Sequence, residues 1–480
     1  MRNLIKYTII SLCTLIVLLI TSCVKFPERP PEVPPEIPKE HVDEQLGYIY
    51  DFGNERQDIM AQITINTDGR INLEQIIAEI PALKYNKSWL FLLTQDDCKH
   101  AAFSSTWAAV NGKPLSKECF YDACHLRGGD FPPDTLSLGK TLGITDGTGK
   151  EVRFAFMTTL APEYNWMDAE TDVNVGFKGN NFRFYMKSGL TWDSVVEIVN
   201  SGNGIAFHDI NATDVENRDT ILKHFSLSQD IIKKRLSGRG CKILAEPNGN
   251  KVYISAAMSY GPIKLMTAQA EAEKLYPFKV KGNLHKGIVE RKFYENEELK
   301  AAVLSELSKE AAERSAVHWG LHSTDLTTAE VLLWLNDTFG KDGDNSVWFP
   351  SLEEYYEYNY LRNNTTIQKS TESNSYKLTL YMPTEQYFYF PSLTINLKGI
   401  KAENIIGVNT SSEISGFSFA NYGDGLMMNI DCRKFLVENA QHYVKLYEKI
   451  KSKSNLMDAL YHIDMLKDSE IKTGLLNRLK

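Results

Sequence analysis

Short apolar runs alternate with segments of helical periodicity from residue 88 to about residue 335. The apolar runs that predict strands are residues 89–93, 152–157, 204–207, 242–245 and 316–321. The stretches that predict helices between them include residues 191–200, 228–236 and 297–312. Strands that alternate with helices of this size are typical of a parallel α/β barrel or a doubly wound sheet.

Two flanking or inserted segments interrupt this pattern. Residues 71–83 form an amphipathic stretch that predicts a helix, with Asn72 as its N-cap and Pro81 near its end. Residues 112–184 are longer than a normal connection and rich in Gly and Pro turns, so we interpret them as an insertion that shapes a cleft. Within it, Asp146-Gly-Thr-Gly149 lacks the Lys-Ser/Thr pair of a phosphate loop, which favours a hairpin turn.

The pattern changes beyond residue 347. Residues 348–363 predict a tyrosine-rich helix, and residues 375–431 alternate apolar and polar positions as strands do. This predicts a small β-sandwich appended to the barrel, followed by two helices between residues 433 and 480. We therefore expect the barrel at residues 45–363, the small β domain at 364–435 and the C-terminal helices at 436–480.

The first 23 residues resemble a bacterial lipoprotein signal. Arg2 and Lys6 precede an apolar stretch, and Ile20-Thr-Ser-Cys23 resembles the lipobox, in which a peptidase cuts before the cysteine and the new N-terminus is acylated. A plain signal peptide and a membrane anchor are the alternatives, although the apolar run is short for a membrane span. We predict a signal peptide at residues 1–22 and a proline-rich tether at 23–44. Lipid on Cys23 would then anchor the protein to the outer membrane of the cell envelope, facing the periplasm or the surface.

Composition narrows the function classes and the redox chemistry. The chain of 480 residues is long enough for several cores, and its net charge of −8 argues against a general nucleic-acid binder. Five cysteines remain besides the acylated one, so at most two internal disulfides can form in an oxidising compartment. Cys119 and Cys124 are close enough in sequence to pair, and no second cysteine pair supports a zinc site there.

Two adjacent carboxylates, Asp96 and Asp97, follow directly after the apolar run 89–93. A buried strand that ends in paired acids presents both side chains to a cleft. There, one carboxylate can bind a metal while the other accepts a proton. An ordinary turn at the end of the strand is the alternative, because Asp favours turns.

Three further segments follow this pair in the chain. The four segments in order are Thr94-Gln-Asp96-Asp97, Gly204-Ile-Ala-Phe-His208-Asp, Leu244-Ala-Glu-Pro247-Asn-Gly249 and Trp319-Gly-Leu-His322. The series resembles the motifs of the NodB-homology polysaccharide deacetylases, the fourth carbohydrate esterase family, over roughly residues 72–363. The resemblance implies an α/β fold, a distorted (β/α)7 barrel.

The resemblance also implies roles for the first two motifs. In the family motif Thr-Phe-Asp-Asp-Gly, the first Asp is the general base and the second binds the metal, which maps to Asp96 and Asp97. The second motif, His-Ser/Thr-x-x-His, supplies two metal ligands; His208 fits the first, but Ala212 stands at the second. Asp214 is the preferred replacement because a carboxylate restores both donor and charge. Other candidates nearby in the sequence are Asn211, Asp209 and His100.

The last two motifs match in part. The third, Arg-Pro-Pro-Tyr-Gly, helps to hold an oxyanion through the tyrosine main chain. Pro247 and Gly249 match it, whereas Ala245 replaces the arginine and Asn248 the tyrosine. The fourth is an apolar strand that ends in Leu-His, which places His322 at the general-acid position.

Several of these side chains have structural alternatives. The histidines at 208, 318 and 322 can be core or strand-end residues, and the last two lie too far apart on a strand to chelate one ion easily. Cys98 has no base placed beside it by sequence, so we interpret it as a packing residue. Aromatic residues of the insertion can stack on sugar rings or belong to the core, namely Tyr164, Trp166, Phe182, Phe184 and Tyr185.

These observations predict a metal-dependent deacetylase that hydrolyses acetyl ester or N-acetyl groups of a polysaccharide or glycan. Asp96 would act as base and His322 as acid, while Asp97, His208 and Asp214 would bind zinc, or else nickel or cobalt. The alternative is a degenerate relative that binds glycan without hydrolysing it, and a third reading is a structural envelope lipoprotein. We expect a monomer with a glycan as its partner and no nucleic acid.

Overall fold

The computed structural model describes residues 49–53, 57–162, 167, 184, 189–209 and 215–480. The predicted signal peptide, the tether, Cys23, Asn211 and Asp214 lie outside the described residues. So do four of the five insertion aromatics, and the fifth, Phe184, is fully buried.

A parallel sheet forms a nearly closed barrel of seven strands, in the order β10-β9-β8-β7-β6-β3-β11. These strands are β3 (Trp89–Gln95), β6 (Met157–Leu160), β7 (Gly204–Phe207), β8 (Ile243–Ala245), β9 (Leu265–Ala268), β10 (Ile288–Glu290) and β11 (Val317–Leu321). Lys292, just after β10, closes the ring: its N–H donates to the His318 carbonyl at 3.0 Å, and its carbonyl accepts from the Gly320 N–H at 2.8 Å. The predicted α/β barrel is therefore confirmed, and a short strand, β12 (Val347–Trp348), pairs with the start of β3.

The strand sequences explain why the barrel forms. All residues of β3, β6, β7, β8 and β9 are buried, so both faces of these strands need apolar side chains. The predicted run 152–157 was only partly right: β5 (Glu151–Arg153) belongs to a hairpin, and the barrel strand β6 begins at Met157.

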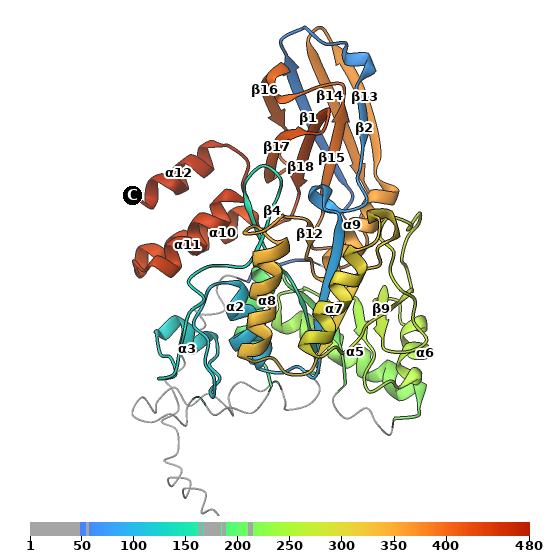
Figure 1. The fold of residues 1–480 in the computed structure, drawn as a ribbon, viewed down its shortest axis with the longest axis vertical. Coiled ribbons are helices and arrows are strands. Elements are labelled where there is room, and N and C mark those ends of the chain that lie inside the picture. Colours follow the sequence, from blue (N-terminus) through green and yellow to red (C-terminus); the bar gives the residue numbers. More distant parts are fainter. Residues whose placement is uncertain (1–48, 54–56, 163–166, 168–183, 185–188, 210–214) are drawn as a thin grey trace, which may run out of the picture. The chain divides into compact units, whose positions relative to one another are not determined.

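Helices follow most of the barrel strands. They are α4 (Trp192–Asn200), α5 (Arg218–Arg235), α6 (Lys251–Ser259), α7 (Asn296–Leu307), α8 (Leu326–Phe339) and α9 (Leu352–Asn364). Figure 1 shows α7 and α8 side by side against the barrel. Polar side chains cap the first turns of several of these helices. For example, the Asp325 carboxylate at the start of α8 accepts from the N–H groups of Thr327 and Thr328.

The insertion contains short elements beside the barrel. These are the π-helix η3 (Ala102–Trp107), α2 (Ala108–Val110), α3 (Ala123–Gly128) and the antiparallel pair β4 (Gly143–Thr145) and β5. The predicted hairpin turn is confirmed, because residues 146–150 join β4 to β5 and the Asp146 N–H donates to the Lys150 carbonyl at 2.9 Å.

Two four-stranded antiparallel sheets complete the β structure, with orders β13-β14-β1-β16 and β17-β18-β15-β2. Their strands are β1 (Ile59–Thr67), β2 (Ile77–Glu79), β13 (Thr366–Glu372), β14 (Ser375–Met382), β15 (Ser392–Lys398), β16 (Ile405–Thr410), β17 (Gly416–Tyr422) and β18 (Gly425–Asp431). Strands predicted within residues 375–431 are thereby confirmed. The sheets also take β1 and β2 from the segment predicted to belong to the barrel, while the domain boundaries at 363 and 435 remain predictions.

The helix predicted at residues 71–83 is wrong. Asn72 caps only a single 3₁₀ turn, η1 (Leu73–Gln75), and the chain then extends as β2. The reason is tertiary: β15 offers an open edge, and Ile77 pairs with Lys398 there, which outweighs the helical periodicity of a short segment. Three further 3₁₀ turns are η2 (Lys84–Asn86), η7 (Ala311–Glu313) and η8 (Ala402–Asn404).

The C-terminal part forms three helices rather than the two predicted: α10 (Leu436–Lys449), α11 (Lys453–Asp464) and α12 (Glu470–Arg478). Asp458 on α11 binds Lys113 and Arg153 of the insertion, the latter at 2.8 Å. None of the helices within the described part of the chain combines the length and apolar character that a membrane-crossing segment requires.

The five described cysteines are thiols and form no disulfide with one another, so the suggested pairing of Cys119 with Cys124 is wrong. The Cys124 thiol instead donates to the Asp193 carboxylate at 3.1 Å.

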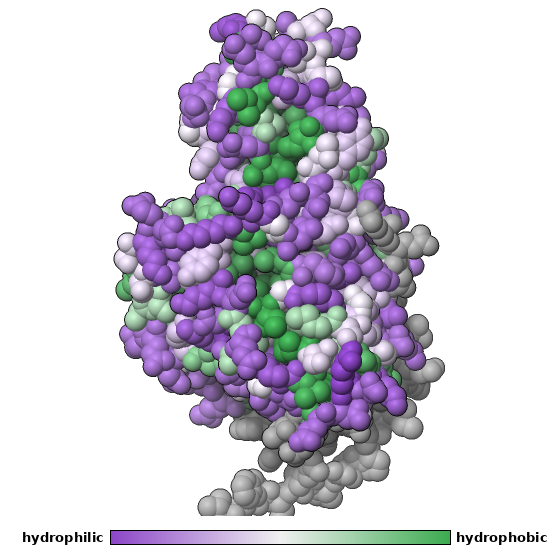
Figure 2. Space-filling view, turned by 90° about the vertical axis from the view of Figure 1, so that its right-hand side faces the viewer, coloured by the Kyte–Doolittle hydropathy of each residue, from purple (hydrophilic) through white to green (hydrophobic). Residues whose placement is uncertain are grey.

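On the face shown in Figure 2, hydrophobic residues lie in narrow strips between larger hydrophilic areas, as expected for a folded protein surface.

Candidate active site

The predicted site residues lie where barrel strands end. Asp96 and Asp97 follow β3, His208 follows β7, and His322 follows β11. The strands are parallel, so their carboxyl ends meet at one end of the barrel. The Asp96 N–H donates to the Leu321 carbonyl at 2.7 Å, which sets the first carboxylate beside the residue that precedes His322.

Asp96 forms a buried ion pair that sequence analysis did not predict. Its Oδ1 accepts from Nη1 of Arg291 at 2.8 Å, and the two side chains are only 2% and 0% exposed. Arg291 follows β10, and its Nη2 also donates to the Glu246 carbonyl at 3.1 Å. The guanidinium therefore holds the Asp96 carboxylate in one orientation.

Asp97 and His208 form the second pair of the site. Asp97 Oδ1 lies 3.3 Å from His208 Nε2, and His208 Nδ1 lies 3.0 Å from the Ala245 carbonyl oxygen. Asp97 and the next residue, Cys98, both adopt left-handed backbone conformations, with φ of 61° and 50°. Such conformations cost energy for residues other than glycine, and they are concentrated at functional sites.

Charge interactions couple the Asp96–Arg291 pair to the Asp97–His208 pair. The hydrogen bond to His208 lowers the pKa of Asp97, and the positive charges of His208, His322 and Lys99 act in the same direction against burial. Burial lowers the pKa of His208, but the charge of Asp96 and the hydrogen bond to Asp97 outweigh it, so the pKa is raised. The ionised carboxylates and the histidine thus stabilise one another.

The Asp97–His208 pair fits a metal ion. A carbonyl oxygen only accepts, so His208 Nδ1 carries a proton and donates to Ala245; whenever the ring is neutral, the Nε2 lone pair therefore points toward Asp97. Two lone pairs 3.3 Å apart repel unless a proton or a cation lies between them. Two donors of one tetrahedral zinc ion lie about 3.4 Å apart, which matches this spacing.

The described residues supply only these two donors. Among them, no cluster of three or more His, Cys, Asp or Glu side chains is placed to hold an ion. Both ring nitrogens of His100 face backbone carbonyls, of Gly189 at 3.1 Å and Tyr121 at 3.0 Å, so His100 is not a ligand. Asp209 accepts from the Tyr253 hydroxyl and lies 3.3 Å from His224 Nδ1, so its carboxylate binds these two side chains.

His322 and His318 lie in different environments. His322 is exposed, and its ring stacks on Phe293 with 4.6 Å between centroids. It contributes to the lowered pKa of Asp97, so it lies within electrostatic reach of the carboxylate pair. His318 is buried, its Nε2 lies 2.8 Å from Thr94 Oγ1, and burial lowers its pKa to about 3. His318 is therefore a neutral structural residue.

The turn at residues 247–249 connects β8 to α6. Asn248 and Gly249 are both left-handed there, with φ of 51° and 69°. The oxyanion role implied for Pro247, Asn248 and Gly249 stays a prediction. Cys98 is fully buried, as expected of a packing residue, and its N–H donates to Thr159 Oγ1 at 3.1 Å.

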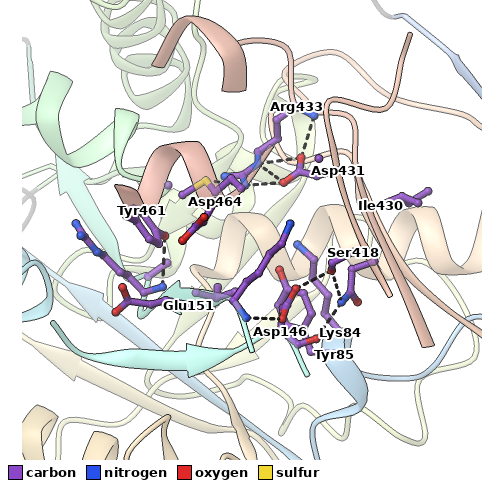
Figure 3. A pocket seen from close by; sticks show the side chains of 18 of the residues that line it. Lys84, Tyr85, Asp146, Glu151, Ser418, Ile430, Asp431, Arg433, Tyr461 and Asp464 are labelled. Atoms are coloured by element: carbon purple, nitrogen blue, oxygen red, sulfur yellow. Dashed lines mark hydrogen bonds and ion pairs between the residues drawn. The ribbon is translucent and has the colours of Figure 1, made fainter. Parts of the chain in front are cut away.

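A small charged cavity of about 80 Å³ lies elsewhere, between the β4–β5 hairpin, the sheet strands β17 and β18, and α11. Its charged residues bind other residues of the protein (Figure 3): Asp431 accepts from Arg433 at 2.9 Å, and Asp146 accepts from Ser418 at 2.7 Å. We interpret this cavity as part of the packing between these elements and not as a ligand site, because its charged side chains bind other groups of the protein.

Comparison with known proteins gave one family. Residues 61–480 match a family model described as "Putative polysaccharide deacetylase". A search of curated proteins gave no match. The matched region includes all of the barrel, the C-terminal helices and both antiparallel sheets except the first two residues of β1.

Proposed function

The chain belongs to the polysaccharide deacetylase family, and from this premise we propose that it hydrolyses acetyl ester or N-acetyl groups of a polysaccharide at the cell envelope. The observation that carries the proposal is the adjacency of two pairs, Asp96–Arg291 and Asp97–His208, at the carboxyl end of the barrel. A buried carboxylate held by a cation beside a carboxylate–imidazole pair suits the activation of water for attack on an acyl carbon.

Asp97 and His208 would hold the metal, with zinc expected and nickel or cobalt as alternatives. A divalent ion bound there would polarise the acyl carbonyl and make the attacking water more acidic. Asp214 remains the proposed third ligand, assigned by the chemistry of its carboxylate and its place six residues after His208 in the sequence.

Asp96 would accept the proton of the attacking water. Arg291 binds Oδ1, so we assign Oδ2 as the oxygen that takes the proton. His322 would donate a proton to the departing amine or alcohol, since its ring is exposed and lies within electrostatic reach of Asp97. The stacked Phe293 would fix the plane of that ring during transfer.

Arg291 would also compensate for the altered third motif. The motif arginine is replaced by Ala245, but Arg291 brings a guanidinium to the same place from β10 and binds the carbonyl of Glu246, the next residue after Ala245. The site would thus keep a guanidinium beside the proposed base Asp96, although Ala245 stands at the position of the motif arginine.

Metal analysis of the purified full-length protein tests the proposal, with Asp97→Ala and His208→Ala beside Asp468→Asn as a matched control. Asp468 is 99% exposed and far from the site in sequence. We expect about one metal ion per chain in the native protein and the control, and loss of metal and of acetate release from acetylated xylan or chitin oligomers in both site variants. Native protein that binds glycan, takes up no metal and releases no acetate would establish the non-hydrolysing alternative instead.

Two finer features belong to the same proposal. We propose that the two antiparallel sheets form a small β-sandwich appended to the barrel, because each sheet buries apolar side chains, Ile63 and Leu378 in one and Leu393 and Ile395 in the other. We also propose that Cys23 is acylated and anchors the protein to the outer membrane. Incorporation of labelled palmitate that disappears in Cys23→Ser would support this anchor, and incorporation that persists would refute it.

A further inference from the structure

A larger cavity lies at the end of the barrel opposite the candidate active site. Its volume is about 580 Å³, within the range of roughly 300–1,000 Å³ that small-molecule sites occupy. Asn200 and Gly202 line it and precede β7, and Arg239 lines it and precedes β8. Because His208 follows β7 and the turn at residues 247–249 follows β8, this cavity and the candidate active site lie at different ends of the barrel.

Three buried polar atoms of the lining residues lack hydrogen-bond partners among the described residues. They are Nδ2 of Asn200, Nη1 of Arg239 and Oδ1 of Asn439. Arg239 is 1% exposed, and its other terminal nitrogen, Nη2, donates to Glu353 at 2.8 Å. Buried polar groups are normally paired, so these three atoms mark places in the wall where a polar ligand would complete the hydrogen bonding once the side chains turn toward the cavity.

Aromatic rings form another part of the wall. Phe52 packs edge to face against Tyr389 at 5.2 Å and against Phe435 at 5.0 Å, and all three line the cavity together with Phe388. A ligand that fits must therefore present apolar surface as well as polar groups.

The charges around the cavity exclude an anion as the natural ligand. Three cations line it, Arg239, Arg433 and Lys434, and three carboxylates balance them, Asp58, Glu385 and Glu413. Each of the cations already has protein partners: Glu353 for Arg239, Asp431 for Arg433, and the carbonyls of Asp51 and Phe52 for Lys434. A purely apolar ligand is also a poor fit, because it would leave the three orphaned atoms unpaired.

We propose that this cavity is a second carbohydrate site, which binds a neutral oligosaccharide away from the catalytic end. Sugar hydroxyls both donate and accept, so they would pair with the two orphaned donors and the orphaned acceptor alike once these groups turn toward the cavity. The C–H faces of sugar rings pack on aromatic side chains. The site does not depend on the proposed hydrolysis; only the choice of probes follows from the substrate class of the family.

Calorimetric titration of the full-length protein with xylotriose, cellotriose and triacetylchitotriose tests the proposal. The variant is Asn200→Ala combined with Asn439→Ala, and the control is Asn477→Ala, an exposed asparagine on α12. The background is Asp97→Ala, so that no trisaccharide is turned over. We expect at least one trisaccharide to bind, about tenfold more weakly to the double variant and unchanged to the control.

Other outcomes overturn the proposal. Binding of equal strength in the double variant would place the sugar elsewhere, and absence of binding by all three sugars at millimolar concentration would remove the site. If the double variant does not fold, Asn439→Leu alone decides, with about a fivefold loss expected. In the double variant with Asp97 intact, we expect acetate release at the native level. Loss of sugar binding at this cavity can therefore be distinguished from failure of the proposed hydrolase.

Discussion

Removal of the Arg291 guanidinium is the sharpest test of how the site is built. In Arg291→Met, the Asp96 carboxylate stays buried, with only 2% of its side chain exposed to solvent. It loses the guanidinium that lies 2.8 Å away in the native protein. Loss of one member of a buried ion pair typically costs about 3–5 kcal/mol, because the remaining charge is left uncompensated in a medium of low polarity. The Glu246 carbonyl loses a donor in the same step.

A double-mutant cycle isolates the pair. Arg291→Met, Asp96→Asn and the combined variant are unfolded in urea, and the coupling free energy is taken from the four free energies of unfolding. We expect the combined variant to recover part of the stability lost in Arg291→Met, because its interior then holds no unpaired charge. The exposed pair Lys300–Glu297 is the matched control, and its coupling should be below about 1 kcal/mol.

The same variant tests catalysis. Because Arg291 orients the proposed base, kcat/KM for an acetylated oligosaccharide should fall about 10²-fold in Arg291→Met, the scale expected when a general base is lost. A coupling free energy no larger than that of the control pair would refute the energetic argument. Native activity in Arg291→Met would refute the assignment of Asp96 as the base that this cation positions.

Three further predictions concern the histidines and the opposite end of the barrel. The raised pKa of His208 means that its ion pair with Asp97 stabilises the metal-free protein fully below about pH 6.5 and less as the pH rises through the folded-state pKa. With chelator present, His208→Gln should therefore lower the free energy of unfolding more at pH 5.5 than at pH 9, and an equal loss at both would contradict this. His322→Asn should lower kcat about 10²-fold while metal content stays native; metal loss would instead make His322 a ligand. Lys242→Met removes one of the two cations that bind Glu353, and both Lys242 and Glu353 are fully buried. The free energy of unfolding in urea should fall by about 3–5 kcal/mol, and a fall of less than about 1 kcal/mol would refute the role of that pair.

The outline of the barrel could be predicted from the sequence because its signals are local. The run from Trp89 to Leu93 is apolar at every position, which is typical of a strand that is covered on both faces in a parallel sheet. Turn and cap residues such as Asp325 mark where helices begin. The order of Asp96, Asp97, His208 and His322 at strand ends follows from the same local pattern, and the parallel barrel then brings them to one end.

Other features depend on contacts between distant residues. Arg291 lies 195 positions from Asp96, and the two meet only because the barrel closes between β10 and β11. The chain at Ile77 becomes a strand because the edge of β15 is available to it, and β1 pairs with β14, where Ile59 lies opposite Met382. Neither partnership leaves a mark in the local sequence.

The sequence by itself therefore determined that strands and helices alternate and which carboxylates and histidines end β3, β7 and β11, since hydrophobic periodicity and strand-end position are properties of short segments. It did not single out β9 or β10, and it placed the start of β6 five residues early. The tertiary structure alone decided which cation holds Asp96, that the described cysteines form no disulfide with one another, and that Asn200, Arg239 and Asn439 line one cavity. The physical reason is that these depend on which distant side chains are brought within hydrogen-bonding reach, and only closure of the barrel and docking of the C-terminal helices set those distances.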